Sequence, residues 1–454
     1  MSVPTNGRVA IIDDKPEQAL PIMNELSKRR CPYTYYTGDL KNLPEEGDNN
    51  DIRVLFLDIY LSGDESRSDK EVKSTLVPVL QRMISKSNFP YILIYWSRHE
   101  DEHKALVEEI FEEDLKDRKP IRSLSLNKSD FFTLTSEPTP EFDAKVAELW
   151  DNILDLLNEV SVYNYLLKWE NIVHSSTDKT VEDVFNNVGD EDDWEISAND
   201  LFKLLGVGFA GKQYFANDAT QQNKNSFYTL NKILQDTLEH SIEEVDGINI
   251  EIEGDGNSLD TDLTNKINSK LLTQPEPNTR NYPGTVLECS DTEFGEGYKA
   301  NVFHHVANYR KIENKIEKEN QGSSKNQINK KCSNFRKKMR EGWKKIWLVV
   351  TPLCDHAQKK LEYSKIVQGI LIKEKYRGFL DHKSEAVFIS PPFRYDEQNY
   401  VMVLQLRNFL SFNQIPEDEN LEIIFRIRQS LLAEVQSKLA RHISRQGVLF
   451  LDYR

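Results

Sequence analysis

The sequence predicts an α/β protein that begins with a doubly wound, five-stranded parallel sheet. A helical middle region and an α+β C-terminal domain with a small, barrel-like sheet are expected to follow. Three observations predict this order. Short apolar runs alternate with amphipathic stretches over residues 1–137, which is typical of a parallel sheet covered by helices. A long stripe of apolar residues at helical spacing comes next. Strand-like runs then return beyond residue 345.

The N-terminal strands are expected at four apolar runs and one weaker candidate. The four runs are RVAII (8–12), VLFL (54–57), YILIYW (91–96) and IRSLSL (121–126), and PYTYY (32–36) is the weaker candidate. Apolar residues at helical spacing predict helices over 16–29, 71–84 and 102–115. Because the strands lack an alternation of apolar and polar residues, helices should cover both faces of the sheet.

A long connecting helix is expected over residues 138–178. Its apolar stripe includes Leu149, Ile153, Leu166 and Trp169, and the stripe slips near Val160. Packing of this stripe on its own domain is favoured over a surface for a partner helix. Residues 179–280 are expected to be acidic and mainly helical, with helices near 201–205 and 227–245 and a candidate strand at 249–253.

The C-terminal module is expected over residues 281–454. Strand-like runs lie at 346–351, 366–372, 386–389 and 401–406, and an amphipathic helix is expected over 424–443. Residues 308–345 carry 13 Lys and Arg against 4 Glu. We interpret this segment as a solvated helical face, or a dock for the acidic segments of the chain, in preference to an RNA contact, because no aromatic or glycine residues interleave the charges.

Composition limits the function classes. The net charge of −16 disfavours general nucleic-acid binding, because such a surface repels phosphates. The four cysteines form no CxxC pair, which is typical of reduced thiols in the cytoplasm. The sequence shows no signal peptide and no apolar run long enough to span a membrane, so we expect a cytoplasmic protein without membrane contact.

The candidate chemistry lies where the predicted parallel strands end. Asp13 and Asp14 follow the first strand, Asp58 follows VLFL, Ser97 follows YILIYW, and Lys128 follows IRSLSL. The carboxyl ends of such strands converge on one crevice. Three carboxylates there would repel one another without a hard cation, and Mg²⁺ suits oxygen ligands best. With a lysine and a hydroxyl to bind phosphoryl oxygens, this set predicts an aspartyl-phosphate site.

These residues resemble the receiver domain of two-component response regulators. The resemblance rests on VAIIDDKPE, VLFLDIYLSGDES, ILIYWSRHEDE and LNKSDFF, and covers about 135 of the 454 residues. It implies that Asp58 is the phosphoacceptor, that Asp13 and Asp14 help bind Mg²⁺, and that Tyr60 adds a backbone carbonyl to the metal. It also implies that Ser97 and Lys128 contact the phosphoryl group, and that a histidine kinase is the donor.

The sequence departs from the receiver pattern in three ways. The intervals from Asp58 to Ser97 and from Ser97 to Lys128, 39 and 31 residues, are longer than usual. Ser129 replaces the usual proline, and Ser125 stands where the aromatic residue that senses the hydroxyl is expected. The resemblance therefore implies phosphorylation chemistry with an altered conformational switch.

A second set of reactive residue types follows the strand-like run near residue 346. Cys354, Asp355 and His356 are adjacent, and Cys289, His304 and His305 could join them to bind zinc. Without paired ligand spacing, a buried cysteine at a strand end is the favoured interpretation. The segment WLVVTPLCDHAQ and the chain's last helical stretch also vaguely resemble modules of bacterial defence-associated proteins.

We therefore expect a phosphorelay protein whose partners are a histidine kinase and an unidentified downstream protein, with a homodimer as a further possibility. Three functions remain open for the phosphorylated protein. It signals through protein contacts, or it is a phosphate sink resembling the buffering component of Detocs-type anti-phage systems. In the third alternative, the C-terminal module is an enzyme. No catalytic signature is present outside the receiver-like segment, which disfavours the third output.

Overall fold

The structure is a computed structural model. It describes residues 7–45, 51–61, 68–98 apart from 87 and 89, 100–186, 193–211, 219–245, 259–275, 279–289, 306–357, 363–413 and 421–444, with residues 4, 188 and 415. The chain divides into two compact units. The N-terminal unit comprises residues 1–198 and 230–253, and the C-terminal unit comprises residues 199–229 and 254–454.

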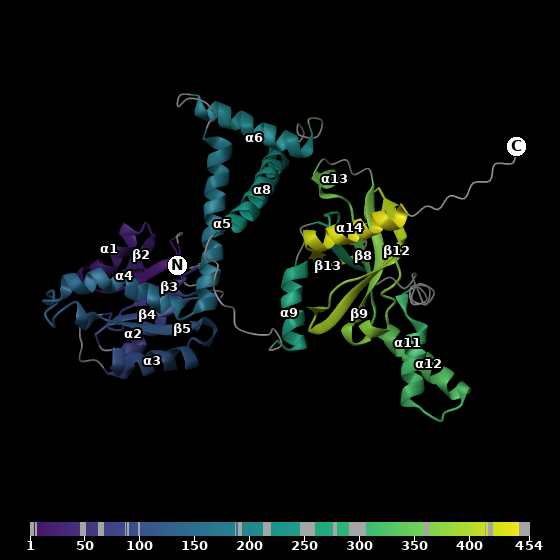
Figure 1. The fold of residues 1–454 in the computed structure, drawn as a ribbon, viewed down its shortest axis with the longest axis horizontal. Helices are drawn as coiled ribbons and strands as arrows, with labels where there is room; N and C mark the ends of the chain where they lie inside the picture. Colours follow the sequence, from purple (N-terminus) through teal and green to yellow (C-terminus); the bar gives the residue numbers. More distant parts are fainter. Residues whose placement is uncertain are drawn as a thin grey trace. The chain divides into compact units, whose positions relative to one another are not determined.

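The N-terminal unit contains a parallel sheet of five strands in the order β2-β1-β3-β4-β5 (Figure 1). Its elements are β1 (Val9–Ile12), α1 (Pro16–Lys28), β2 (Tyr33–Tyr36), β3 (Val54–Leu57), α2 (Asp69–Met83), β4 (Ile92–Ser97), α3 (Glu100–Glu113), β5 (Arg122–Asn127), α4 (Phe142–Asn158) and α5 (Ser161–Phe185). The predicted parallel sheet is thus confirmed, including the weaker candidate β2.

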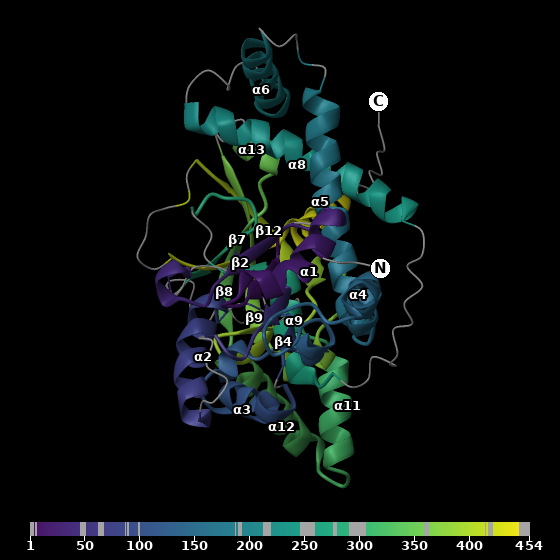
Figure 2. The same ribbon diagram turned by 90° about the vertical axis from the view of Figure 1, so that its left-hand side faces the viewer.

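Helices cover both faces of this sheet, as Figures 1 and 2 show. Helices α2 and α3 pack on one face, where Leu76 and Ile110 contribute to one apolar core. Helices α1 and α4 cover the other face, where Ile22 and Ile153 contribute to a second core. The inner strands β1, β3 and β4 are buried along their whole length, which explains their continuously apolar sequences. The edge strands β2 and β5 are only partly buried and carry polar residues.

The expected connecting helix is not one continuous helix. Helix α4 ends at Asn158 and α5 begins at Ser161, at the point where the apolar stripe slips. The side chains of α5 that pack on the N-terminal unit are Tyr163 and Leu167, each 1% exposed. Leu166 and Trp169, which the sequence placed on the packing stripe, are exposed. The change of face follows from the break, because the helix restarts with a new rotational phase.

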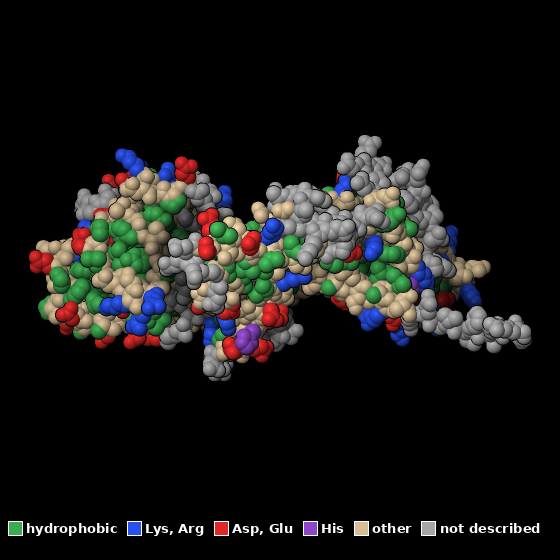
Figure 3. All heavy atoms as spheres, turned by 90° about the horizontal axis from the view of Figure 1, so that it is seen from above, with side chains coloured by type: hydrophobic (Ala, Val, Ile, Leu, Met, Phe, Trp, Pro, Cys, Tyr) green, Lys and Arg blue, Asp and Glu red, His purple; other side chains and the backbone are tan. Residues whose placement is uncertain are grey.

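Two further helices, α6 (Trp194–Ala210) and α8 (Ala219–Glu244), confirm the helical character of the middle region. Both helices run across the division between the two units. Ile196 and Leu204 of α6 are among the large exposed apolar residues. Figure 3 shows that hydrophobic side chains also lie at the surface elsewhere among the polar ones. The candidate strand at 249–253 lies outside the described residues.

The C-terminal unit is built on a curled antiparallel sheet of eight strands. Seven strands follow the order β10-β12-β9-β8-β7-β13-β6, and β11 pairs with β12. The elements are α9 (Thr261–Leu272), β6 (Thr273–Gln274), β7 (Thr285–Cys289), α11 (Tyr309–Glu319), α12 (Lys325–Glu341), β8 (Lys344–Val349), α13 (Leu353–Ala357), β9 (Ser364–Lys373), the 3₁₀ helix η4 (Glu374–Phe379), β10 (Val387–Ile389), β11 (Phe393–Tyr395), β12 (Gln398–Phe412), β13 (Leu421–Ile427) and α14 (Gln429–Ile443).

Two helical layers complete this unit. Leu432 and Val435 of α14 pack with Leu348 and Met402 on one face of the sheet. The basic segment forms the hairpin of α11 and α12, whose apolar side chains, such as Ile316, join a core on the other face. The prediction of a helix starting at residue 424 is wrong for residues 424–427, which belong to β13. Ile424 and Phe425 suit either structure, so periodicity could not separate them.

Candidate functional site

Three carboxylates meet at the carboxyl ends of two adjacent central strands. Asp13 and Asp14 follow β1, Asp58 follows β3, and one oxygen from each carboxylate lies within 4.8 Å of the others. The strand order reverses between β1 and β3, and in open α/β sheets ligands bind at this reversal. The sheet topology therefore brings together three residues that are up to 45 positions apart in the sequence.

Lys128 reaches the same point from the end of β5. Its Nζ lies 2.7 Å from Asp58 Oδ2 and 2.8 Å from Asp13 Oδ2, and its side chain is only 1% exposed. A buried ammonium group is tolerated only when it is paired and hydrogen-bonded. The two carboxylates meet that requirement, so Lys128 is held between Asp13 and Asp58.

One lysine does not balance three carboxylates. The pKa of Asp13 is raised to about 7, chiefly by burial and also by the neighbouring Asp58, while Lys128 opposes the shift. Burial and Asp58 likewise raise the pKa of Asp14. Within the described part of the chain, the buried Asp14 Oδ1 atom has no hydrogen-bond partner. A divalent cation would supply both the missing charge and a ligand for that oxygen, and this acidic cluster could hold one.

Ser97 is the last residue of β4, in register with Asn127 of β5. It is fully buried, and its Oγ atom has no hydrogen-bond partner among the residues that the structure describes. A buried hydroxyl without a partner is costly, and such groups are often reserved for a ligand. The hydroxyl is thus available to a group that enters the crevice.

Tyr60 connects the loop after β3 to two helices. Its backbone N–H donates to Asp58 Oδ1 at 3.3 Å, and its hydroxyl contacts His103 Nε2 on α3. His103 Nδ1 lies 3.3 Å from Asp69 Oδ1 at the start of α2. Sequence reasoning missed His103 and Asp69, because neither lies at a strand end and nothing in HEDEHK separates His103 from a surface residue.

The remaining predicted residues are placed as follows. Ser125 is half-buried in the middle of β5, paired with Tyr95 of β4, and Ser129 lies in the exposed turn after Lys128. Cys354 is exposed, so the expectation of a buried cysteine at this position is wrong. Among the described residues, the groups that could hold a metal ion do not include Cys354, Asp355, His356 or the buried Cys289. His304 and His305 lie outside the described residues.

Comparison with family models, with curated proteins and with solved structures found no match. In the part of the chain that the structure describes, no helix has both the length and the apolar character needed to cross a bilayer.

Proposed function

We propose that this protein is a response-regulator-like phosphorelay protein that accepts a phosphoryl group on Asp58 from the phosphohistidine of a histidine kinase. The observation that carries the proposal is the convergence of Asp13, Asp14, Asp58 and Lys128 at one sheet edge, with the contacts given above. The strand order β2-β1-β3-β4-β5 supports it, because receiver domains share that order.

Each residue of the site has a defined part in this transfer. A carboxylate oxygen of Asp58 attacks phosphorus, the phosphorus–nitrogen bond breaks, and the electron pair of that bond returns to the histidine of the kinase. The product is an acyl phosphate on Asp58. Lys128, already 2.7 Å from Asp58 Oδ2, offers its ammonium group to the phosphoryl oxygens. The Ser97 hydroxyl donates a hydrogen bond to the same group.

The residues present fit a magnesium ion. Asp13, Asp14 and Asp58 offer hard oxygen ligands. Burial, and then the charge of Asp58, raise the pKa values of Asp13 and Asp14, so a cation would stabilise their ionised forms. Tyr60 would contribute its backbone carbonyl. Bound there, the ion would shield the negative charge of the phosphoryl oxygens.

Signalling through protein contacts is the first proposed output, and the phosphate sink is the second. One observation favours the sink. Ser125 carries a small, half-buried side chain on β5, where a receiver that switches would hold a mobile aromatic ring. A sink needs the chemistry of Asp58 but no such movement. The described C-terminal unit, with its own sheet and helical layers, favours the first output because phosphate storage does not require it.

The chemical proposal is tested by intact-mass analysis. Incubation of the full chain with a small phosphodonor and Mg²⁺ should add one phosphoryl mass to the wild type and none to Asp58→Asn. Omission of the divalent cation should abolish the adduct. An equal adduct on Asp58→Asn would refute the assignment of the phosphoacceptor.

A further inference from the structure

The C-terminal unit contains a polar cleft of about 320 Å³. It lies between α9, the junction of β9 with the 3₁₀ helix η4, and the turn that joins β11 to β12. The residues that line it are Asp262, Lys373, Glu374, Lys375, Arg394, Glu397, Gln398 and Asn399. All of them belong to the C-terminal unit, far along the chain from Asp58.

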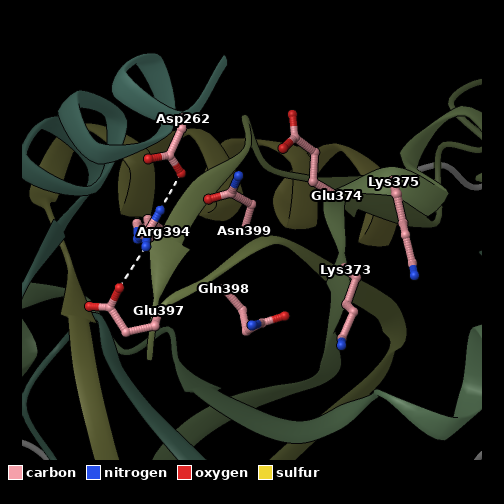
Figure 4. Close-up of a pocket in the computed structure, with 8 residues that line it drawn as sticks. All are labelled: Asp262, Lys373, Glu374, Lys375, Arg394, Glu397, Gln398 and Asn399. Atoms are coloured by element: carbon pink, nitrogen blue, oxygen red, sulfur yellow. Dashed lines mark hydrogen bonds and ion pairs between the residues drawn. The ribbon is translucent and has the colours of Figure 1, made fainter. Parts of the chain in front are cut away.

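One side of the cleft is already paired. Arg394 bonds both Asp262 of α9 and Glu397 of the turn, as Figure 4 shows. Glu374 Oε2 accepts a hydrogen bond of 2.7 Å from Asn265 Nδ2. The three carboxylates of the cleft are therefore each held by a side chain of the protein.

The other side carries cations without carboxylate partners. Among the described residues, neither Lys373 nor Lys375 forms an ion pair, and Figure 4 shows both on the side of the cleft opposite Arg394. The Lys375 ammonium lies 5.1 Å from the ring centre of Tyr376. The stem of Lys373 passes over Gly342, where an added Cβ would come within 3.1 Å of Lys373 Cε. Packing thus restricts the direction of Lys373.

Between the two sides lie the amide side chains of Gln398 and Asn399 (Figure 4). The Asn399 Oδ1 atom is buried and has no hydrogen-bond partner within the described part of the chain. Buried acceptors are nearly always paired. Because Asn399 lines the cleft, rotation of its amide toward a ligand would give Oδ1 the donor that it lacks.

The turn that shapes the cleft is strained. Asp396 and Glu397 have positive φ values of 49° and 56°. A residue such as glutamate rarely adopts this conformation, and such strain gathers at functional sites. The ion pair between Arg394 and Glu397 spans this turn.

We propose that this cleft binds a small polar molecule with an oxyanion group, phosphate or carboxylate. The oxyanion lies against Lys373 and Lys375, and a hydroxyl or amine of the ligand donates to Asn399 Oδ1. A volume near the lower end of the usual range of about 300–1,000 Å³ suits a metabolite rather than a macromolecule. The proposal is independent of phosphorylation at Asp58.

The test is isothermal titration calorimetry on the full chain after divalent cations have been removed with a chelating resin, so that such cations do not recruit anions to the carboxylates of the N-terminal unit. Inorganic phosphate, glycerol 3-phosphate and succinate are the probes, and they separate a phosphate site from a carboxylate site. We expect at least one probe to bind in the millimolar range. The double variant Lys373→Ala/Lys375→Ala should weaken that binding by about tenfold or more, since charged hydrogen bonds are lost.

The matched control is Lys337→Ala/Lys338→Ala, which removes two exposed lysines of α12 that do not line the cleft. This variant should bind the probes as the wild type does. Absence of binding by all three probes would overturn the proposal. The proposal would also be overturned if the Lys373→Ala/Lys375→Ala variant bound the probes as tightly as the wild type does. It would be overturned too if the control variant lost as much affinity as the cleft variant, because either result would show diffuse attraction to surface charge.

Discussion

Lys128 Nζ lies 2.7 Å from Asp58 Oδ2, although β4 separates the strands that carry the two residues. The long lysine stem spans the ends of β4 and β3, and the same ammonium group lies 2.8 Å from Asp13. The lysine therefore links both carboxylates that flank the strand reversal. Its removal should leave two nearly buried carboxylates without a cation, which leads to the first prediction.

Substitution Lys128→Met should lower the free energy of unfolding by about 3–5 kcal/mol, the usual cost of leaving a buried charge uncompensated. Mg²⁺ should restore part of this loss, because it supplies positive charge to the same carboxylates. Urea unfolding with EDTA and with Mg²⁺ measures both effects. The control is Lys73→Met, which removes a lysine that contacts Glu109, Glu113 and Asp114 in an exposed position and should change stability much less. Equal losses in the two variants would contradict the argument.

The second prediction concerns pH. In the folded state the pKa of Asp13 is raised from 3.8 to about 7 by burial and by Asp58. The folded protein thus binds this proton more tightly than the unfolded chain does, so the metal-free protein should lose stability as the pH rises from about 4 to about 7. The side chain of Asp13→Asn cannot ionise, so the stability of this variant should change less between about pH 4 and about pH 7. Thermal unfolding in EDTA across this range is the measurement, and a profile of Asp13→Asn identical to that of the wild type would exclude Asp13 as the cause.

The third prediction concerns the attachment of α5. Glu170 accepts hydrogen bonds from Arg53 and Arg8, which precede β3 and β1, and the Tyr163 hydroxyl donates to the backbone carbonyl of Arg53. Glu170→Ala should cost about 1–3 kcal/mol, as expected for hydrogen bonds between charged groups. Amide hydrogen exchange should rise over residues 161–170.

Phosphorylation of Asp58 should persist in Glu170→Ala, because Arg8 and Arg53 lie at the amino ends of the strands, opposite the site. Glu182→Ala, an exposed change on the same helix, should leave exchange over 161–170 unaltered. An unchanged exchange rate in Glu170→Ala would show that Tyr163 and Leu167 alone hold the helix.

Much of the N-terminal unit could be predicted from the sequence, because its signals are local. Each buried strand is a continuous apolar run, and a polar residue marks each strand end that faces the crevice. The rotational phase of α5, which determines which of its side chains are buried, could not be predicted. Leu166 and Leu167 have the same apolar side chain, and only the break before Ser161 decides that Leu167 is buried. A periodic pattern cannot fix the face of a helix across an interruption.

Prediction of the candidate site from the sequence has the same limit, because only its local signals could be recognised. Asp13, Asp58 and Lys128 were predictable because the parallel strand order places their positions together. The contact of Tyr60 with His103 depends on how α3 is rotated over the sheet, which the sequence does not encode in any short motif. The cleft between Arg394 and Lys373 was likewise hidden, because it is formed by a turn, a 3₁₀ helix and α9, which are far apart in the sequence.

The last prediction distinguishes the two proposed outputs, because the substitution Asp58→Asn should have opposite effects on the pathway in the two cases. The carboxamide of Asp58→Asn cannot carry phosphate, so this variant ends phosphoryl acceptance in either case. If phosphorylated Asp58 activates an output through protein contacts, cells that carry the variant should lose the pathway response. If the protein instead drains phosphate from a shared kinase, the variant removes the drain.

Spontaneous firing of the kinase would then over-activate another receiver, and growth should suffer without any stimulus. The measurement is the growth and pathway output of an Asp58→Asn strain with its native kinase. A strain that also lacks the kinase serves as the control, because the growth defect of a lost sink requires phosphate from that kinase. Toxicity that disappears when the kinase is deleted would decide for the sink. A quiet loss of output would decide for regulation through protein contacts, since the small Ser125 side chain would then not prevent Asp58 from reaching its output.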